Sequence, residues 1–279
     1  MLPRMVFLVL GAGYTGARVA AALLARGATV HVTTRTPGRP GLPRGAVVHR
    51  ADAADPAGLR ALAARLPAGL RILHSVPVLE GPAGPWDPTP VLLEAFGSRA
   101  ARVVYLSTTG VYGAQPAVDE TTPPAPDTER TRLRLAAERA VAAGPWSWMV
   151  LRPAAIYGPG RGVHEAMRAG RYRLAGAGDN FVSRIHVDDL AALAVAALES
   201  EAGGAWPVAD ATPARAREVA AFCAGLLGLP MPPSAPPEAL HETLRSDRRV
   251  DGAAVLRLLG VALRHPDYRE GIRAALHGG

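Results

Sequence analysis

The sequence predicts an α/β protein with a Rossmann-like, doubly wound parallel sheet and a smaller C-terminal lobe. Residues 5–27 hold a short apolar run, a glycine-rich turn and an Ala/Leu-rich helical stretch in succession. Strand-like and helix-like segments go on alternating along the chain, which favours parallel strands joined by right-handed crossovers. A length of 279 residues, with 49% hydrophobic and 20% charged residues, suits one large α/β domain that carries a smaller lobe.

The glycine-rich turn predicts a dinucleotide site. Gly11, Gly13 and Gly16 follow the apolar run 6–10 in the G-x-G-x-x-G spacing, and helical residues 15–26 come next. Gly11 permits a tight turn, Gly13 has no Cβ to hold a pyrophosphate away, and Gly16 lets helix and strand approach closely. The N–H groups of Tyr14 and Thr15 lie at the positive end of the helix dipole, which favours phosphate. The alternative is a tight strand–helix turn that binds no ligand.

Composition excludes several kinds of chemistry and partner. All 31 basic residues are arginine and the net charge is +7, so no lysine can serve as base, Schiff-base partner or proton relay. The arginines are scattered and not interleaved with aromatic residues, so we expect no nucleic-acid partner. The single cysteine, Cys223, excludes an internal disulfide and a cysteine-based zinc site, and we expect no metal.

The same sequence predicts a cytoplasmic protein. No apolar run is long enough to span a membrane, so we expect no membrane partner. The chain enters its first strand almost at once, so we expect no signal peptide.

The end of the second strand, residues 28–33, predicts the choice of coenzyme. It runs into Thr34 and Arg35 and lacks the acidic residue that would bind a ribose 2′-hydroxyl. Hydroxyls and an arginine suit a 2′-phosphate instead, so we predict NADP(H), with NAD(H) as the alternative. The competing interpretation makes Arg35 a solvated loop residue. Open α/β sheets bind ligands at the carboxyl ends of their strands, and there we expect further coenzyme contacts from Asp52, His74, Ser75, Val76, Ser107 and Pro153.

The remaining segments complete the alternation. Asp55 followed by Pro56 predicts a capped helix start, and an acidic residue, Asp188 or Asp189, is expected to cap a helix at 190–198. We expect strands at 47–50, 70–74, 102–106, 147–151, 172–174 and 206–209, helices at 59–66, 91–96, 128–143, 216–227 and 252–259, and loops at 37–44, 116–127 and 230–237, the last a proline-rich linker suited to a mobile flap.

Four further motifs resemble one protein superfamily. They are STTGVYG at 107–113, RPAAIYGPGR at 152–161, SRIHVDDLA at 183–191 and the tail at 249–272. With the glycine motif, they resemble the extended or atypical short-chain dehydrogenase/reductase superfamily, in its NAD(P)-dependent epimerase/dehydratase-like branch. Gly11, one position after the first glycine of extended members, matches atypical members. The resemblance implies a dinucleotide-binding domain from 1–160 and 186–203, and a small C-terminal substrate lobe from 161–185 and 204–279.

The resemblance also implies where catalysis takes place, and the chain departs from it there. Active members carry a Tyr-x-x-x-Lys pair on the helix after the fifth strand, in which the tyrosine transfers a proton while hydride moves. Alignment on Glu138 places Arg130 at the tyrosine and Arg134 at the lysine, while Thr108 matches the family's Ser/Thr. Arginine is a poor acid, although Arg134 could still bind the ribose. The alternative makes Arg130 and Arg134 a solvated pair on one helix face.

Other side chains are candidates for the missing acid or for the substrate site. Tyr112 and Tyr157 stand near strand ends, His74 and His164 are further options, and both tyrosines alternatively pack within family motifs. Tyr157 and Arg184 are the candidate substrate contacts, and Arg184 alternatively forms a structural ion pair.

We therefore expect an oxidoreductase or epimerase/dehydratase-like enzyme, a monomer or homodimer, that transfers hydride to or from a small carbonyl or sugar-like substrate. The alternative is a non-catalytic NADP(H)-binding sensor or regulatory protein.

Overall fold

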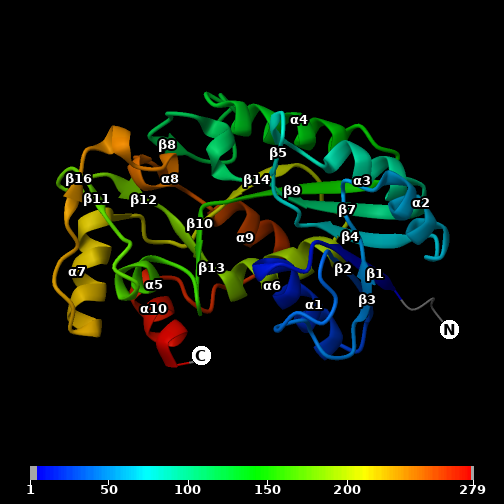
Figure 1. Ribbon diagram of the computed structural model, residues 1–279, viewed down its shortest axis with the longest axis horizontal. Helices are drawn as coiled ribbons and strands as arrows, with labels where there is room; N and C mark the ends of the chain where they lie inside the picture. The colour runs from blue at the N-terminus through cyan, green and yellow to red at the C-terminus, as the bar shows by residue number, and fades with distance from the viewer. Residues whose placement is uncertain (1–4, 278–279) are drawn as a thin grey trace.

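A seven-stranded parallel sheet forms the centre of the protein, in the order β14-β9-β7-β4-β1-β2-β3 (Figure 1). The computed structural model describes residues 5–277. Every pair of neighbouring strands is parallel, which confirms the predicted doubly wound sheet. The strands are β1 (Val6–Leu10), β2 (Thr29–Thr34), β3 (Val47–Arg50), β4 (Leu70–His74), β7 (Ala100–Leu106), β9 (Ser147–Pro153) and β14 (Ala205–Val208).

Helices cover both faces of the sheet, because successive side chains of a strand point to opposite faces. In β1, Phe7 and Val9 pack under one layer of helices, while Leu8 and Leu10 pack under the other. The first layer is α1 (Tyr14–Ala25), α6 (Val187–Glu199) and α9 (Ala253–Leu259), and the second is α2 (Pro56–Ala64), α3 (Thr89–Phe96) and α4 (Glu129–Ala142). The apolar run at the start of the chain is thus buried on both sides, as its composition predicts.

Local sequence explains three of the helix ends. The carboxylate of Asp55 accepts a hydrogen bond from the Gly58 amide at 2.9 Å and caps α2, with Pro56 in the first turn. Thr128 and Thr131 form a reciprocal capping box at the start of α4. Gly27, just after α1, has a φ of 75°, which favours glycine at the end of a helix.

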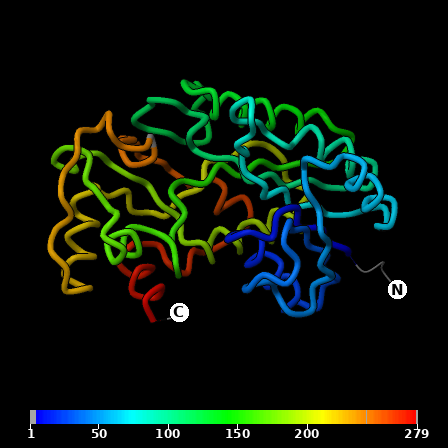
Figure 2. The backbone as a smooth tube through the Cα atoms, in the orientation of Figure 1, coloured from blue at the N-terminus to red at the C-terminus, as the bar shows by residue number. Residues whose placement is uncertain are grey.

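A second hydrophobic cluster forms the other end of the molecule, opposite α2 in Figure 2. It is built mainly from α5 (Val163–Arg168), α7 (Ala216–Leu227) and α10 (Tyr268–His277). Around it lie β11 (Leu174–Ala175), β12 (Phe181–Val182), β15 (Ala214–Arg215), β16 (Ser234–Ala235), a 3₁₀ turn (Pro237–Ala239) and α8 (Glu242–Arg245). The remaining strands are β5 (Leu79–Gly81), β6 (Gly84–Trp86), β8 (Ala117–Val118), β10 (Ala155–Tyr157), β13 (Arg184–His186) and β17 (Arg249–Val250).

Several expectations need correction. The strand predicted at 206–209 in the small lobe is β14, the edge strand of the central sheet, and α9 packs with it on that sheet. The strand predicted at 172–174 begins only at Leu174. The proline-rich linker 230–237, predicted as a mobile flap, contains strand β16, which pairs with β11. The antiparallel hairpin β5–β6 has no counterpart in the expected elements, because its glycine- and proline-rich sequence shows no periodicity.

The start of α6 also differs from the prediction. The helix begins at Val187, and the ring Nδ1 of His186 accepts the Asp188 amide at 3.2 Å, so the cap is a histidine. The Asp189 carboxylate instead accepts the amides of Arg264 and His265 at 2.7 and 3.0 Å. Within residues 5–277, none of the helices combines the length and the apolar character that crossing a bilayer requires.

Candidate active site

A pocket of about 1030 Å³ lies at the carboxyl ends of the central strands, between the sheet and the C-terminal lobe. The glycine turn, the segments after β4, β7 and β9, and the first turns of α4 form its sheet side. Residues 181–183 and 241–250 form its other side. Of the predicted site residues, those that line it are Gly13, Tyr14, Thr15, Ser75, Ser107, Thr108, Arg130, Arg134 and Pro153.

The glycine turn has the geometry of a phosphate-binding loop. Gly11 has a φ of 88°, and its amide donates to the Thr33 hydroxyl at 2.9 Å. A Cβ on Gly16 would lie 2.2 Å from the Gly11 carbonyl oxygen, whereas a Cβ on Gly13 would meet no atom within 4 Å. No side chain caps α1 at Gly13, so the positive end of this helix opens toward the pocket. The turn therefore fits a dinucleotide.

The predicted adenosine-side residues lie beyond the lining of this pocket. Arg35 is exposed, and the Thr34 hydroxyl pairs with the backbone of Thr36. The Asp52 carboxylate accepts the Ala54 amide at 3.0 Å. Arg39, which sequence reasoning missed in a Pro/Gly-rich loop, donates to the carbonyl of Ala12 inside the glycine turn. The Arg39 guanidinium thus lies at the glycine turn.

His74 supports the segment after β4 without lining the pocket. Burial, and then the charge of Arg134, lower the pKa of His74 to about 3, so the ring is neutral. Its Nδ1 accepts the Val76 amide at 3.3 Å, and its Nε2 donates to the Thr89 hydroxyl at 2.8 Å. His74 and Val76 therefore hold the backbone that places Ser75 at the pocket.

Thr108 and Ser107 lie at the end of β7 on a buried network. The Thr108 hydroxyl accepts the Gly110 amide at 3.0 Å and caps a 3₁₀ turn (Thr109–Tyr112). The Ser107 hydroxyl donates to Glu138 at 2.5 Å. Glu138 and Arg152 form a buried ion pair at 2.6 Å, which holds the Ser107 hydroxyl in place.

Tyr112, a predicted catalytic residue, belongs to this network and not to the pocket lining. Its side chain is fully buried and its hydroxyl accepts a hydrogen bond from Arg152 at 3.0 Å. Burial raises the pKa of Tyr112. Held by Arg152, the Tyr112 hydroxyl stabilises the motif at residues 107–113.

Arg130 and Arg134 lie one turn apart on α4 and both line the pocket. Arg134 Nη1 donates to the Tyr105 hydroxyl at 2.5 Å and to the Val76 carbonyl at 3.3 Å, and lies 3.8 Å from the Asp87 carboxylate. Arg130 Nη1 forms an ion pair with Glu80 at 2.9 Å, and its Nη2 donates to a backbone carbonyl. Both guanidiniums are thus engaged by the β5–β6 hairpin and the segment after it.

The two predicted substrate residues are buried in the core of the C-terminal lobe. Tyr157 is 4% exposed, and its ring packs edge-on against His186 with centroids 5.2 Å apart. Arg184 is also 4% exposed and donates to the Val182 carbonyl at 2.6 Å. The parallel pair β10–β13 places Tyr157 in this core, while Ile156 and Ile185 pack with the sheet cluster. Neither Tyr157 nor Arg184 lines the pocket. His164, a further acid/base option, is buried as well.

The C-terminal side of the pocket is basic, which sequence reasoning missed. Arg161, His241, Arg245 and Arg248 line it, together with one carboxylate, Asp247. The three arginines of RSDRR at 245–249 were the available signal. Arg248 donates to the carbonyls of Thr109 at 2.8 Å and of Gln115 and Gly113, and so ties this segment to the end of β7.

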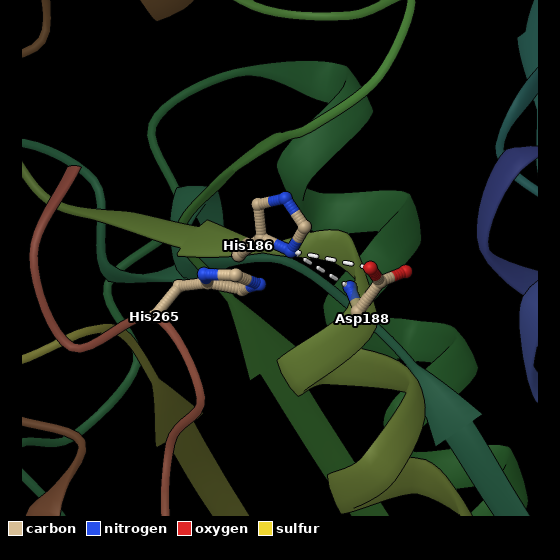
Figure 3. Close-up of side chains that lie close together, drawn as sticks. All are labelled: His186, Asp188 and His265. Atoms are coloured by element: carbon tan, nitrogen blue, oxygen red, sulfur yellow. Dashed lines mark hydrogen bonds and ion pairs between the residues drawn. The ribbon is translucent and has the colours of Figure 1, made fainter. Parts of the chain in front are cut away.

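His186, Asp188 and His265 form a group of side chains of the kinds that bind metals (Figure 3). Their ligand atoms lie within 4.8 Å of one another. The Nδ1 of His186 is already used by the Asp188 amide, and Arg18 lies 3.4 Å from the Asp188 carboxylate. The rings of His186 and His265 pack with centroids 4.1 Å apart. The group lies at the start of α6, where the His186 ring caps the helix.

Comparison with known proteins places the chain in a family. The model of the NAD dependent epimerase/dehydratase family matches residues 86–209. A 3-diazoavenalumate denitrifying reductase from a Streptomyces species is 33% identical over 305 aligned positions, which cover 96% of this chain and 99% of the relative. This chain belongs to the NAD-dependent epimerase/dehydratase family. The resemblance found in the sequence motifs is thereby confirmed, and the protein is an NAD-dependent enzyme.

Solved structures agree with this assignment. A conserved protein of unknown function from Silicibacter pomeroyi is 30% identical, with a TM-score of 0.79 over 99% of both chains. The UDP-glucose 4-epimerase of Thermus thermophilus, solved with NAD, is 24% identical, with a TM-score of 0.83 over 98% of both chains. The likeness to the Thermus enzyme shows a shared fold, and the structure of that enzyme contains NAD.

Proposed function

We propose that this protein is an NADPH-dependent reductase that delivers hydride to the ring carbon bearing the diazo group of a small aryl carboxylic acid and releases dinitrogen. The observation that carries the proposal is the pair Arg130 and Arg134 in the pocket. By alignment on Glu138 they stand where the family resemblance implies an acid and its lysine partner. Because arginine hardly gives up a proton, this site suits a reduction that consumes none.

The glycine turn supports the coenzyme half of the proposal. The open space at Gly13 and the uncapped start of α1 suit a pyrophosphate, and the reduced nicotinamide would supply the hydride. NADPH is favoured over NADH because β2 ends in Thr34 and Arg35 without an acidic residue, and Arg39 lies beside the turn.

The other phenols near the pocket are poorly placed to replace the missing acid. Tyr14 is the one tyrosine among the described lining residues, and its hydroxyl donates to the Pro159 carbonyl at 3.0 Å. Burial raises the pKa of both Tyr14 and Tyr105. The Tyr105 hydroxyl, in addition, accepts from Arg134 and donates to Asp87. Reduction of a carbonyl substrate requires a proton on the carbonyl oxygen, and neither tyrosine is well placed to donate it.

A diazonium group accepts a hydride without any proton. The ring carbon gains the hydride, the C–N bond breaks, and its electron pair leaves with neutral N₂, so charge and electrons balance. An aryl diazonium ion persists in water long enough to bind, whereas an alkyl one decomposes. The name of the Streptomyces relative, a denitrifying reductase of a diazo carboxylate, supports this substrate class. The Asp87 carboxylate compensates the charge of Arg134 beside such a cation.

Three side chains receive roles in this proposal. Thr108 lies at the end of β7 and contacts the substrate, Arg130 binds its carboxylate, and Arg134 positions the segment after β4. Tyr112, Tyr157 and Arg184 do not line the pocket, and we give them no contact with the substrate.

Isotope transfer tests the proposal directly. The protein is mixed with a cinnamate that carries a ring diazonium group and with NADPH deuterated at C4 of the nicotinamide. We expect one cinnamate and one N₂ per NADPH oxidised, with deuterium on the ring carbon that lost nitrogen. In D₂O with unlabelled NADPH, we expect no deuterium there. Solvent deuterium at that carbon, or no acceleration over the protein-free mixture, would overturn the proposal.

A matched pair of glycine variants controls for spontaneous reduction. Gly13→Val places a side chain in open space, so we expect the fold to persist while NADPH binding falls roughly 100-fold or more. Gly225→Ala, in α7 with nothing near its Cβ, should keep full activity. Equal activity of the two variants would remove the glycine turn from the mechanism.

The coenzyme preference has its own test. In Arg35→Ala the 2′-phosphate loses a charge-assisted contact, so the Kd of NADPH should rise roughly tenfold while that of NADH stays unchanged. Calorimetric titration with both coenzymes measures this, and equal losses would refute the role of Arg35. NADPH binding without turnover of the diazonium acid or of a carbonyl panel would favour the alternative of a non-catalytic sensor.

A further inference from the structure

Two arginine–carboxylate pairs join α4 to the β5–β6 hairpin. Arg134 faces Asp87, which directly follows β6, and Arg130 faces Glu80 in the middle of β5. The Arg134–Asp87 side chains are 12% and 5% exposed, whereas those of Arg130 and Glu80 are 42% and 73% exposed. The two pairs therefore differ in how easily another anion can replace the carboxylate.

The inner pair is fixed by its surroundings. The Asp87 carboxylate accepts hydrogen bonds from the Thr89 amide at 2.9 Å and hydroxyl at 2.5 Å, and from the Tyr105 hydroxyl at 3.3 Å. Arg134 is held in turn by Tyr105 and by the carbonyl of Val76. Displacing Asp87 would leave several buried groups without partners, which is costly.

The outer pair has less support, which in the described protein is a hydrogen bond from Arg130 Nη2 to the Val78 carbonyl at 3.2 Å. Glu80 contacts Arg130 through one carboxylate oxygen at 2.9 Å, and ion pairs with this exposure contribute little to stability. Arg130 also lines the main pocket, so its guanidinium is accessible from the site of the proposed reaction. An incoming carboxylate can take the place of Glu80 with the same charge and the same planar geometry.

The rim beside this pair offers Glu80 a second partner. An adjoining cavity of about 390 Å³ is lined by Glu80, Glu129, Arg130 and Arg245, among others. Its two arginines and two glutamates balance in charge. An incoming anion is therefore attracted to Arg130 only after Glu80 has moved away from Arg130. Arg245 is the cation that Glu80 can then approach.

We propose that Arg130 is the receptor for the substrate carboxylate and that Glu80 is a built-in competitor, which the substrate displaces. The proposal rests on the proposed function for the carboxylate itself, but not on the diazo group or on hydride transfer. It predicts that removing the charge of Glu80 improves binding of carboxylates, whereas most substitutions in a binding site weaken it.

Binding of an unreactive acid tests the competition. The probes are 4-hydroxycinnamate and its neutral amide, titrated calorimetrically into the protein with NADP⁺ present. We expect Glu80→Gln to bind the acid roughly two- to fivefold more tightly and the amide unchanged, which is the scale of an exposed ion pair. Arg130→Gln should lose the preference for acid over amide. Glu94→Gln removes the carboxylate of another exposed pair, Arg60–Glu94, and should behave as the wild type.

Each remaining outcome decides between the proposals. No tightening in Glu80→Gln, a preserved acid preference in Arg130→Gln, or no binding of the acid to the wild type would overturn this inference. If the acid behaves as expected while the diazonium substrate is not reduced, only the proposed function fails. If the diazonium acid is reduced while Glu80→Gln binds the probes like the wild type, only the competition between Glu80 and substrate fails.

Discussion

The buried polar groups of the two ends of the molecule are partnered to different degrees. At the sheet end, Glu138 and Arg152 join Ser107 and Tyr112 in one closed set. His74, Thr89, Asp87, Tyr105 and Arg134 form a second set that reaches the pocket. At the C-terminal end, the side chains that each keep a buried polar atom without a hydrogen-bond partner in the described protein include Tyr157, His186, Asp210 and Tyr268.

This difference separates a rigid end of the molecule from an adaptable one. Closed networks specify one arrangement, because any displacement leaves a buried donor or acceptor unpaired. The sheet end therefore holds Ser107 and Arg134 in fixed positions. The C-terminal end has less to lose when these side chains shift, although they do not line the pocket themselves.

The largest expected effect comes from opening the network around Asp87. Asp87→Asn removes the charge opposite Arg134, so we expect the free energy of unfolding to fall by about 3 kcal/mol. Glu80→Gln, on the same hairpin but exposed, should lose less than about 1 kcal/mol. Urea unfolding of both variants measures the contrast. Equal losses would show that the inner pair is no more fixed than the outer one.

The glycine turn was predictable because its roles are set by local backbone geometry. Gly11 needs a positive φ, Gly16 lies against a carbonyl, and Gly13 faces open space, and all three requirements act within one strand–helix unit. The parallel pairing of the central strands followed from the same alternation of segments. Local rules of this kind do not depend on what the rest of the chain does.

The side-chain half of the site was only partly predictable, because it depends on distant partners. Arg130 and Arg134 were found by resemblance, but Glu80 and Asp87 come from a hairpin with no periodic signal. Tyr157 follows a strand end, where a ligand contact was expected. The pairing of β10 with β13 places Tyr157 in the lobe core instead, and no local pattern in the sequence shows that pairing.

Asp210, at the C-terminal end, should make the free energy of unfolding depend on pH. Burial raises its pKa to about 7, despite a hydrogen bond from the Thr212 amide and the charge of Arg184. Because this pKa is above the ordinary value, the folded protein binds the proton more tightly than the unfolded chain, and stability falls as pH rises toward 7. The uncharged side chain of the Asp210→Asn variant does not cause this loss of stability at higher pH. The stability of the variant relative to wild type should increase by roughly 2–3 kcal/mol between pH 5 and pH 8 in urea unfolding. A difference that is constant with pH would place the ionised carboxylate in a satisfied site.

The smallest expected effects on stability come from removing two tyrosine hydroxyls, one at each end of the molecule. Tyr112→Phe leaves Arg152 without one buried acceptor, so we expect a loss of about 1–2 kcal/mol in the free energy of unfolding. Tyr157→Phe removes a hydroxyl that has no partner in the described protein, so its stability should change by less than about 0.5 kcal/mol. Neither hydroxyl lines the pocket, so both variants should bind NADPH with wild-type affinity. If Tyr157→Phe is the more destabilised of the two, the C-terminal end has a partner for that hydroxyl, and the division into a rigid and an adaptable side fails there.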